Sequence, residues 1–255
     1  MKEDQLFSSY LEAIDQRFEG WDFSYISETG RMGSELLSWS YGSMVKSLMH
    51  SAKSMLDMGT GGGEFLSMLR PFPDKVCATE AYEPNIRIAR NRLEPLGVGV
   101  FPIKDDTNLP FEKNQFDFIV NKHAAYSPNE VRRIVREDGI FLTQQVGGSN
   151  CSDINKYLGT TINEDFLNWN MEVAETELKN HFFEFLYGKE EFPVQRFYDI
   201  GALVYYLKAI PWQVPDFSIN RYEKELYQIH QLIQSSGYFE VKQHRFIIKA
   251  KAVWS

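Results

Sequence analysis

Cysteine is scarce in this chain. The 255 residues include two cysteines, Cys77 inside a predicted buried strand and Cys151 after another. Two isolated thiols cannot build the disulfide framework of a small secreted domain, and they do not provide the cysteine pairs of a structural zinc site. The sequence therefore predicts structural thiols and no metal centre.

Long apolar runs and an excess of basic charge are lacking as well. No run approaches the roughly 18 residues that span a bilayer, and residues 1–17 carry charges where a signal peptide has its apolar core. The formal net charge of -8 opposes polyanion binding unless a local basic patch overrides it. We therefore expect a cytoplasmic protein without a membrane partner, and nucleic acid is a disfavoured partner.

Hydrophobic periodicity is clear from residue 53 onward, where predicted strands and helices alternate. The predicted strands are Ser54–Met58, Lys75–Glu80, Val98–Lys104, Phe116–Asn121 and Gly139–Val146. The predicted helices are Glu64–Arg70, Pro84–Leu96 and Pro128–Arg136, the last opened by the capping-box residues Ser127 and Glu130. This alternation indicates an α/β core with a mostly parallel sheet and helices on both faces.

The flanking segments follow other patterns. Helical spacing over Leu6–Phe18 and Tyr41–His50 leads us to treat residues 1–50 as an N-terminal helical flap. Beyond Gly148 the predicted elements are a helix over 164–185, a short strand over 192–197, helices over 198–210 and 222–235, and a last strand over 241–253. Residues 51–255 would then be one domain, with residues 198–237 as an aromatic-rich helical insertion.

A glycine-rich turn follows the first strand of the core. The sequence Leu56-Asp57-Met58-Gly59-Thr60-Gly61-Gly62-Gly63-Glu64 closes an apolar strand and opens a helix, which is where α/β sheets bind ligands. A dinucleotide fingerprint would have its third glycine at the position of Glu64, and a carboxylate there opposes a pyrophosphate. The spacing therefore favours S-adenosylmethionine (SAM), whose methionine end is cationic, over a nicotinamide cofactor.

Acidic residues follow the next two strands. Glu80 ends the second strand about twenty residues after the glycines, where an acid binds ribose hydroxyls. Asp105 follows the third strand, where a carboxylate can accept from an adenine amino group, and Leu109 and Phe111 provide apolar packing nearby. Taken alone, either segment could be an ordinary solvated turn.

Taken in order, these segments resemble the motifs of class I SAM-dependent methyltransferases of the methyltransferase type 11 group. The resemblance covers residues 53–146, including Phe116–Val120 and Gly139–Val146, and it implies a Rossmann-like, seven-stranded sheet with an antiparallel last strand. Two departures are Asp106, where a small residue is common, and the turn Glu137-Asp138-Gly139.

The resemblance also implies roles for individual residues. Asp57 and the glycine backbone would hold the methionine part of SAM, Glu80 the ribose, and Asp105 with the Asp106 amide the adenine. The cofactor-binding residues that we expect are Asp57, Gly59, Thr60, Gly61, Glu80, Ala81, Asp105, Asp106, Thr107 and Asn121.

The methyl acceptor is expected over the carboxyl ends of the fourth and fifth strands. Methyl transfer is an in-line displacement that positioning alone can accelerate, so a catalytic base is not obligatory. His123 is the one histidine there and is our candidate general base, with a loop histidine bonded to backbone as the alternative. The expected acceptor-binding residues are Tyr126, Gln145, Tyr198, Tyr206 and Trp212, with Gln144 in place of Gln145 as a second option.

Several functions remain open at this stage. A small-molecule methyltransferase is the leading hypothesis, because basic residues are sparse in the aromatic segment 192–217. An RNA methyltransferase and a catalytically silent SAM-binding protein are the alternatives. An NAD(P)-dependent oxidoreductase is disfavoured by Glu64 and by the lack of a Tyr-x-x-x-Lys pair near the glycine turn. Residues 198–237 could be a lid over the acceptor, a satellite core or a dimer face; the oligomeric state stays open.

Overall fold

The computed structural model describes residues 4–12, 23–162, 164 and 166–254. The chain divides into two compact units. The core unit comprises Ser38–Val146, Trp169–Glu190 and Arg245–Ser255, and the small unit comprises Met1–Leu37, Gly147–Asn168 and Glu191–His244. Residues 38–50 belong to the core unit, and residues 147–168 belong to the same unit as residues 198–237. The expected domain bounds stay predictions.

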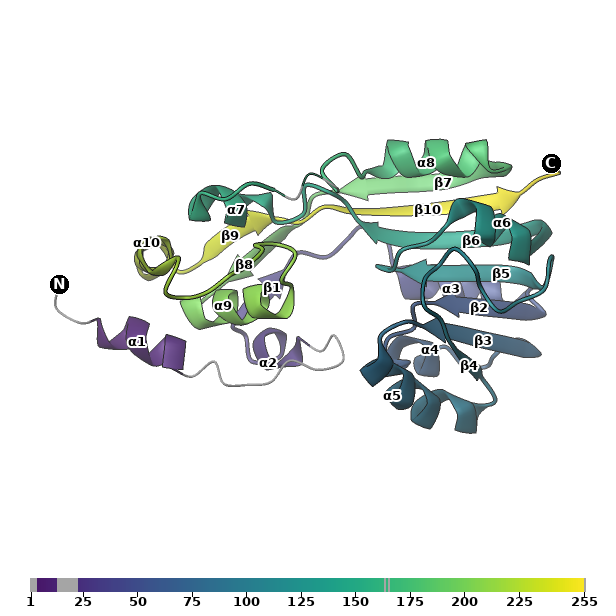
Figure 1. The fold of residues 1–255 in the computed structure, drawn as a ribbon, viewed down its shortest axis with the longest axis horizontal. Coiled ribbons are helices and arrows are strands. Elements are labelled where there is room, and N and C mark those ends of the chain that lie inside the picture. The colour runs from purple at the N-terminus through teal and green to yellow at the C-terminus, as the bar shows by residue number, and fades with distance from the viewer. Residues whose placement is uncertain (1–3, 13–22, 163, 165, 255) are drawn as a thin grey trace. The chain divides into compact units, whose positions relative to one another are not determined.

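A seven-stranded sheet forms the centre of the core unit, in the order β4-β3-β2-β5-β6-β10-β7 (Figure 1). The strands are β2 (Ser54–Met58), β3 (Lys75–Glu80), β4 (Gly99–Pro102), β5 (Phe116–Lys122), β6 (Val135–Val146), β7 (Phe183–Glu191) and β10 (Arg245–Ala252). Strands β4, β3, β2, β5 and β6 are parallel, and β10 runs antiparallel to β6. The mostly parallel sheet with an antiparallel last strand is confirmed.

Helices cover both faces of this sheet, with α3 on one face and α6 on the other (Figure 1). They are α3 (Tyr41–Met49), α4 (Glu64–Met68), α5 (Glu83–Leu93), the short 3-10 helix η1 (Glu94–Leu96), α6 (Pro128–Ile134) and α8 (Met171–Asn180). The side chains of Ser40, Ser127 and Asn170 accept hydrogen bonds from the N–H groups three residues later. These N-caps satisfy otherwise unpaired donors and set where α3, α6 and α8 begin.

Two predicted elements beyond residue 148 are wrong. The helix expected over 164–185 begins at Met171 and ends at Asn180, and Phe183 starts strand β7 instead. Phe182 has a left-handed φ of 61°, and its carbonyl accepts from the N–H of Val253, so the chain turns out of the helix and joins the sheet beside β10. The last strand expected over 241–253 is two strands, because the ladder is interrupted between Lys242 and Arg245.

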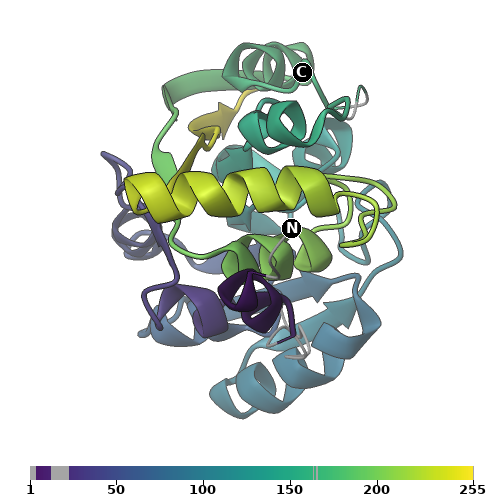
Figure 2. The same ribbon diagram turned by 90° about the vertical axis from the view of Figure 1, so that its left-hand side faces the viewer.

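The small unit is built on a separate antiparallel sheet in the order β1-β8-β9. Its strands are β1 (Met32–Ser34), β8 (Val194–Phe197) and β9 (Phe239–Lys242), and its helices are α1 (Gln5–Glu12), α2 (Ser24–Ser27), α7 (Ser152–Leu158), α9 (Ile200–Ala209) and α10 (Glu223–Ser236). Figure 2 shows α10 running across this unit with α9 and α1 nearby, and α9 contacts both helices. Nearly all of α9 is buried, so this helix is the centre of a second hydrophobic core.

The remaining expectations for the flanks are met in part. Phe7 of α1 packs in the core of the small unit, whereas Ile14 and Phe18, predicted to continue that helix, lie outside the described residues. The roles of residues 1–50 as a flap and of 198–237 as a lid stay predictions. Within the described part of the chain, no helix is both long enough and apolar enough to cross a membrane.

Candidate functional site

The glycine turn leaves the sheet at its centre. Strand β2 is fully buried and pairs with β3 on one side and β5 on the other. The turn connects its last residue, Met58, to the start of α4 at Glu64. The carboxyl ends of β2, β3 and β5 therefore bring Asp57, Glu80 and Asn121 together around residues 59–63.

Gly59 and Gly61 are required for different reasons. Both have a left-handed backbone, with φ of 69° and 63°, which a side chain makes unfavourable. A Cβ on Gly59 would lie 2.4 Å from the Cβ of Ala124, whereas a Cβ on Gly61 would meet no atom within 4 Å. Gly59 is thus needed for packing, and Gly61 faces open space that a ligand can enter.

Glu80 holds the glycine turn by its carboxylate. Oε2 accepts from the N–H of Gly61 at 2.7 Å, and Oε1 accepts from the N–H groups of Ala81 at 2.9 Å and Tyr82 at 2.7 Å. A carboxylate offers about four acceptor positions, so these bonds leave about one for a ligand hydroxyl. The side chain expected to bind ribose is therefore also the anchor of the turn.

Asp57 is a buried carboxyl beside this turn, with 5% of its surface exposed. Burial, reinforced by the nearby Glu80 carboxylate, raises the pKa of Asp57 to about 7, and the Thr60 hydroxyl and Lys122 oppose the rise. A cationic ligand group would offset the same desolvation and favour the ionised carboxylate. Asp57 therefore suits a ligand ammonium.

Two buried hydroxyl groups near Asp57 are available to bind a ligand. Thr60 Oγ1 and Tyr41 Oη are buried, and neither forms a hydrogen bond of good geometry with a described residue, although Thr60 lies close enough to Asp57 to oppose the rise of its pKa. Buried polar groups of this kind are normally paired with protein, water or ligand. The donors and acceptors around the turn fit a polar, cationic cofactor end.

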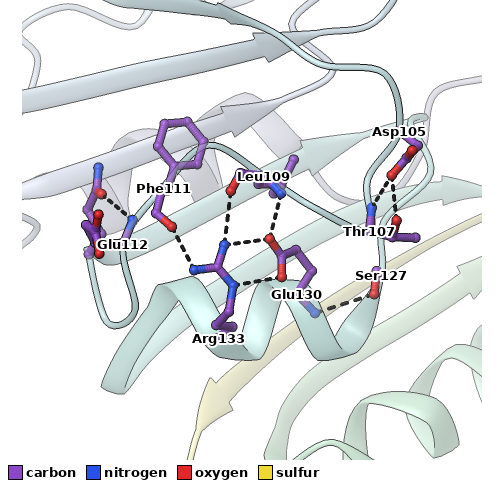
Figure 3. Close-up of polar contacts among 9 residues, drawn as sticks. Asp105, Thr107, Leu109, Phe111, Glu112, Ser127, Glu130 and Arg133 are labelled. Carbon is purple, nitrogen blue, oxygen red and sulfur yellow. Dashed lines mark hydrogen bonds and ion pairs between the residues drawn. The ribbon is translucent and has the colours of Figure 1, made fainter.

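Asp105 lies in an exposed turn after β4 and binds its own loop (Figure 3). Its Oδ1 accepts from the N–H of Thr107 at 2.9 Å and from Thr107 Oγ1 at 2.5 Å. These bonds are the main cause of the lowered pKa of Asp105, so it is a charged acceptor. Contacts of Asp105, Asp106 and Thr107 with adenine stay predictions.

An ion pair between the buried Glu130 and the partly exposed Arg133 supports this loop (Figure 3). Glu130 accepts from the N–H of Leu109 at 2.6 Å and pairs with Arg133, which donates to the carbonyls of Leu109 and Phe111. Ser127 caps α6 as expected, but the Glu130 carboxylate serves the loop rather than completing the capping box. The spacing of Glu130 and Arg133 on one helix face is the sequence signal for this role, which the capping box of Ser127 and Glu130 alone does not reveal.

The polar residues at the ends of β5 and β6 bind one another. Asn121 Oδ1 accepts from Thr143 Oγ1 at 3.0 Å and from Gln145 Nε2 at 2.5 Å, and Gln145 also donates to the carbonyl of Ala124. Gln145 is thus engaged in holding the loop after β5. Its expected acceptor contact, like the cofactor contact of Asn121, stays a prediction.

Tyr126 points into the core unit. Its ring packs edge-on against Phe141 with centroids 5.0 Å apart and also faces Trp169. Its hydroxyl is buried without a hydrogen-bond partner among the residues that the structure describes, and burial raises the pKa of that group. Because the ring of Tyr126 packs among aromatic residues of the core, a packing role suits this residue better than the expected contact with the acceptor.

Three expected acceptor-binding residues belong to the small unit. Tyr198 and Trp212 are exposed, whereas Tyr206 is 7% exposed and packs against Phe23 and Phe197. Tyr206 is therefore a core residue of that unit. Acceptor binding by Tyr198 and Trp212 stays a prediction.

Two charged residues near the turn have roles that the sequence left unassigned. Lys122 follows Asn121, and its Nζ lies 6.0 Å from the ring centre of Tyr41 and 5.3 Å from that of Phe65. Arg92 of α5 binds both the Glu64 carboxylate and the Gly62 carbonyl. A basic residue at the carboxyl end of β5 is the sequence signal for Lys122, whereas the role of Arg92 is revealed only by the packing of α5 on α4.

The same part of the chain matches a known family. Residues 56–143, from the glycine turn through β6, match the methyltransferase domain family. This segment of the core unit is therefore similar to a methyltransferase domain. A segment of 92 residues is 28% identical to the uncharacterized methyltransferase YcgJ of Bacillus subtilis (strain 168), covering 35% of this chain and 36% of that protein. The match thus spans about a third of the curated relative.

Solved structures share the fold of this domain at low identity. The BH2331 protein of Bacillus halodurans C-125 is 16% identical with a TM-score of 0.59, over 84% of this chain and 97% of that one. YcgJ of Bacillus subtilis is 13% identical with a TM-score of 0.58, over 84% and 98%. The geranyl diphosphate C-methyltransferase of Streptomyces coelicolor A3(2), solved with Mg²⁺, geranyl diphosphate and S-adenosyl-L-homocysteine, is 14% identical with a TM-score of 0.51, over 83% and 78%.

Alanine at Gly59 and at Gly61 should separate an effect on folding from an effect on ligand binding. Both variants incur the left-handed strain of about 1 kcal/mol. Gly59→Ala also clashes with Ala124, so its thermal midpoint should fall well below that of Gly61→Ala. Gly61→Ala should stay folded but bind S-adenosylhomocysteine more weakly, because its methyl group enters the open space.

The matched control is the double variant Gly59→Ala, Ala124→Gly, which removes the clashing methyl group and should recover most of the lost stability. Calorimetric melting and ligand titration measure the two effects. Equal losses of stability in the two single variants would contradict this assignment.

Proposed function

We propose that the protein transfers the methyl group of SAM to a small-molecule acceptor. The open space over Gly61, bordered by Asp57 and Glu80, is the observation that carries this proposal. It is supported by the match to the methyltransferase domain family and by the related fold of an enzyme solved with S-adenosyl-L-homocysteine.

The residues of the turn fit the three parts of the cofactor. Asp57 would pair with the methionine ammonium, and the remaining acceptor position of Glu80 would take a ribose hydroxyl. The loop over Asp105–Thr107, held by Glu130 and Arg133, would meet the adenine. SAM supplies an electrophilic methyl group on a sulfonium, and the protein's part is to hold the acceptor in line with that methyl group and exclude water.

The acceptor is proposed to be a small molecule because the chain is acidic overall. A net charge of -8 opposes a polyanionic RNA, which needs counterion release from a basic surface. An RNA acceptor, or binding of SAM without turnover, are outcomes that the following experiment can reveal.

Calorimetric titration of cofactor-free protein with SAM, S-adenosylhomocysteine and NADH tests the proposal. We expect micromolar binding of both adenosyl compounds and none of NADH. Binding of NADH alone would overturn the proposal, and so would lack of binding by all three. If the adenosyl compounds bind, transfer of a labelled methyl group to pooled small metabolites or to RNA distinguishes the acceptor classes, and transfer to neither indicates a SAM-binding protein without turnover.

A further inference from the structure

The loop after β5 presents His123 in a fixed backbone conformation. Its φ is 57°, and its N–H donates to the carbonyl of Gln144 at 2.8 Å. The side-chain amides of Gln145 and Asn121 donate to the backbone carbonyls of Ala124 and Ala125, respectively. His123 and Lys122 keep exposed surface, so a ligand can reach both.

The hydrogen bonds to Gln144 determine which ring nitrogen of His123 carries the proton. Trp39 Nε1, which can only donate, lies 2.8 Å from Gln144 Oε1. This contact orients the amide, so that Gln144 Nε2 faces His123 Nε2 at 3.0 Å. An amide nitrogen donates, so His123 Nε2 must accept, and the proton of the neutral ring is on Nδ1.

The charges around His123 favour this neutral ring. Desolvation by the surrounding protein, and then the cations Arg245 and Lys122, lower the pKa of His123, although the side chain keeps exposed surface. A neutral imidazole whose one basic lone pair already accepts a hydrogen bond cannot readily take another proton. These contacts favour a role other than the general base expected from the sequence.

We propose that Trp39 and Gln144 hold His123 as a neutral Nδ1–H donor, and that this N–H, together with Lys122, binds an oxyanion of the methyl acceptor. Lys122 makes no ion pair with any described residue, and its side chain is exposed. A hydrogen-bond donor beside an ammonium is the chemistry that recognises a carboxylate or a phosphate. Trp39 and Gln144, both buried, act as positioning residues through His123. The acceptor part of this proposal rests on the proposed methyltransferase function.

Nitrogen NMR of the full-length protein, labelled with ¹⁵N in its histidines, tests the tautomer. The His123 signals, assigned by their loss in His123→Asn, should show a protonated Nδ1 and an unprotonated Nε2 at pH 7. Trp39→Phe removes the donor that orients Gln144, so a mixture of tautomers should appear. Gln144→Glu places a carboxylate against Nε2 and should move the proton to Nε2 or charge the ring. A wild-type ring that is charged, or protonated on Nε2, would overturn the tautomer assignment whether or not SAM binds.

Anion titrations of the S-adenosylhomocysteine complex test the acceptor class. We expect acetate or inorganic phosphate to shift the His123 Nδ1 signal saturably, and Lys122→Gln to weaken that binding by roughly fivefold or more. Lys104→Gln, an equal charge change at another exposed lysine, is the control and should leave the titration unchanged. A response to acetate alone indicates a carboxylate acceptor, and a response to phosphate alone a phosphorylated one.

If neither acetate nor phosphate binds, the acceptor assignment is overturned. Failure of S-adenosylhomocysteine to bind, with the His123 tautomer as described, would instead overturn the proposed function and leave the positioning role of Trp39 and Gln144 intact.

Discussion

Replacing Glu80 by alanine should nearly abolish cofactor binding and also loosen the glycine turn. The carboxylate accepts three backbone N–H groups, one of them from Gly61, so the substitution removes the anchor of the turn. Hydrogen bonds to a charged group contribute about 1.5 to 3 kcal/mol each. Loss of the remaining contact to a ribose hydroxyl alone should weaken S-adenosylhomocysteine binding roughly 10- to 150-fold, and a disordered turn should weaken it further.

Titration calorimetry and chemical denaturation measure the two losses separately. Glu83→Ala is the matched control, because it removes the same charge from an exposed position at the start of α5 and should change both quantities little. Glu80→Gln keeps the shape of the side chain, but its amide nitrogen faces some of the backbone N–H donors. Its cofactor affinity and its stability should therefore lie between those of wild type and Glu80→Ala. Normal affinity in a folded Glu80→Ala protein would refute the placement of the ribose at this strand end.

Cofactor affinity should depend on pH through Asp57. Its pKa of about 7 in the free protein, caused chiefly by burial, means that the carboxyl is largely protonated below pH 7. A ligand ammonium requires the ionised form, so affinity for S-adenosylhomocysteine should rise with pH by up to about tenfold per unit and level off above pH 7. Binding near pH 6 should release close to one proton, which calorimetry in buffers of different ionisation enthalpy detects.

The ligand and the side chain each provide a control for this pH profile. Methylthioadenosine lacks the amino-acid part of the cofactor, so its affinity should not follow the ionisation of Asp57. Asp57→Asn should bind S-adenosylhomocysteine more weakly at pH 8 and with a flat profile. A wild-type profile that is flat between pH 5 and 8 would contradict the pairing of Asp57 with the ammonium.

The stability of the free protein should also depend on the ionisation of Asp57, but it should fall as the pH rises, whereas cofactor affinity should increase. The pKa of Asp57 is raised by folding, so its protonated form favours the folded state. We compare the free energy of unfolding of the wild type with that of Asp57→Asn. The difference should be highest below about pH 4, where the carboxyl is protonated in both the folded and the unfolded protein, and it should decline up to about pH 7. Denaturation of both proteins across this range measures the difference.

The local order of elements along the sequence was sufficient to predict the core sheet within residues 53–146. Each of the first parallel strands is a short apolar run next to its covering helix, so pairing with sequential neighbours leaves few alternatives. The glycines of the turn and the acids at strand ends lie at fixed distances along the chain, which is why Asp57, Gly61 and Glu80 could be selected together. Their clustering follows from parallel strands ending at one edge of the sheet.

Pairing between distant segments was not evident in the same way. The residues of β7 continue an apolar helical pattern, and they form a strand because the edge of the sheet beside β10 offers backbone partners. The alternation over 241–253 is continuous in the sequence, yet β9 pairs with β8 in one sheet and β10 with β6 in the other. Strand partners far apart in the chain are chosen by burial and hydrogen bonding in the folded protein.

What the sequence by itself determined is the order of the α/β core, the class of the domain and the residues around the glycine turn. The tertiary structure alone decided the second sheet, the anchoring of the turn by Glu80 and the contacts that bind His123. The physical reason is that strand periodicity and turn chemistry are local, whereas the direction of a side chain and the proton position on a ring depend on groups such as Trp39 and Gln144, which are 105 residues apart.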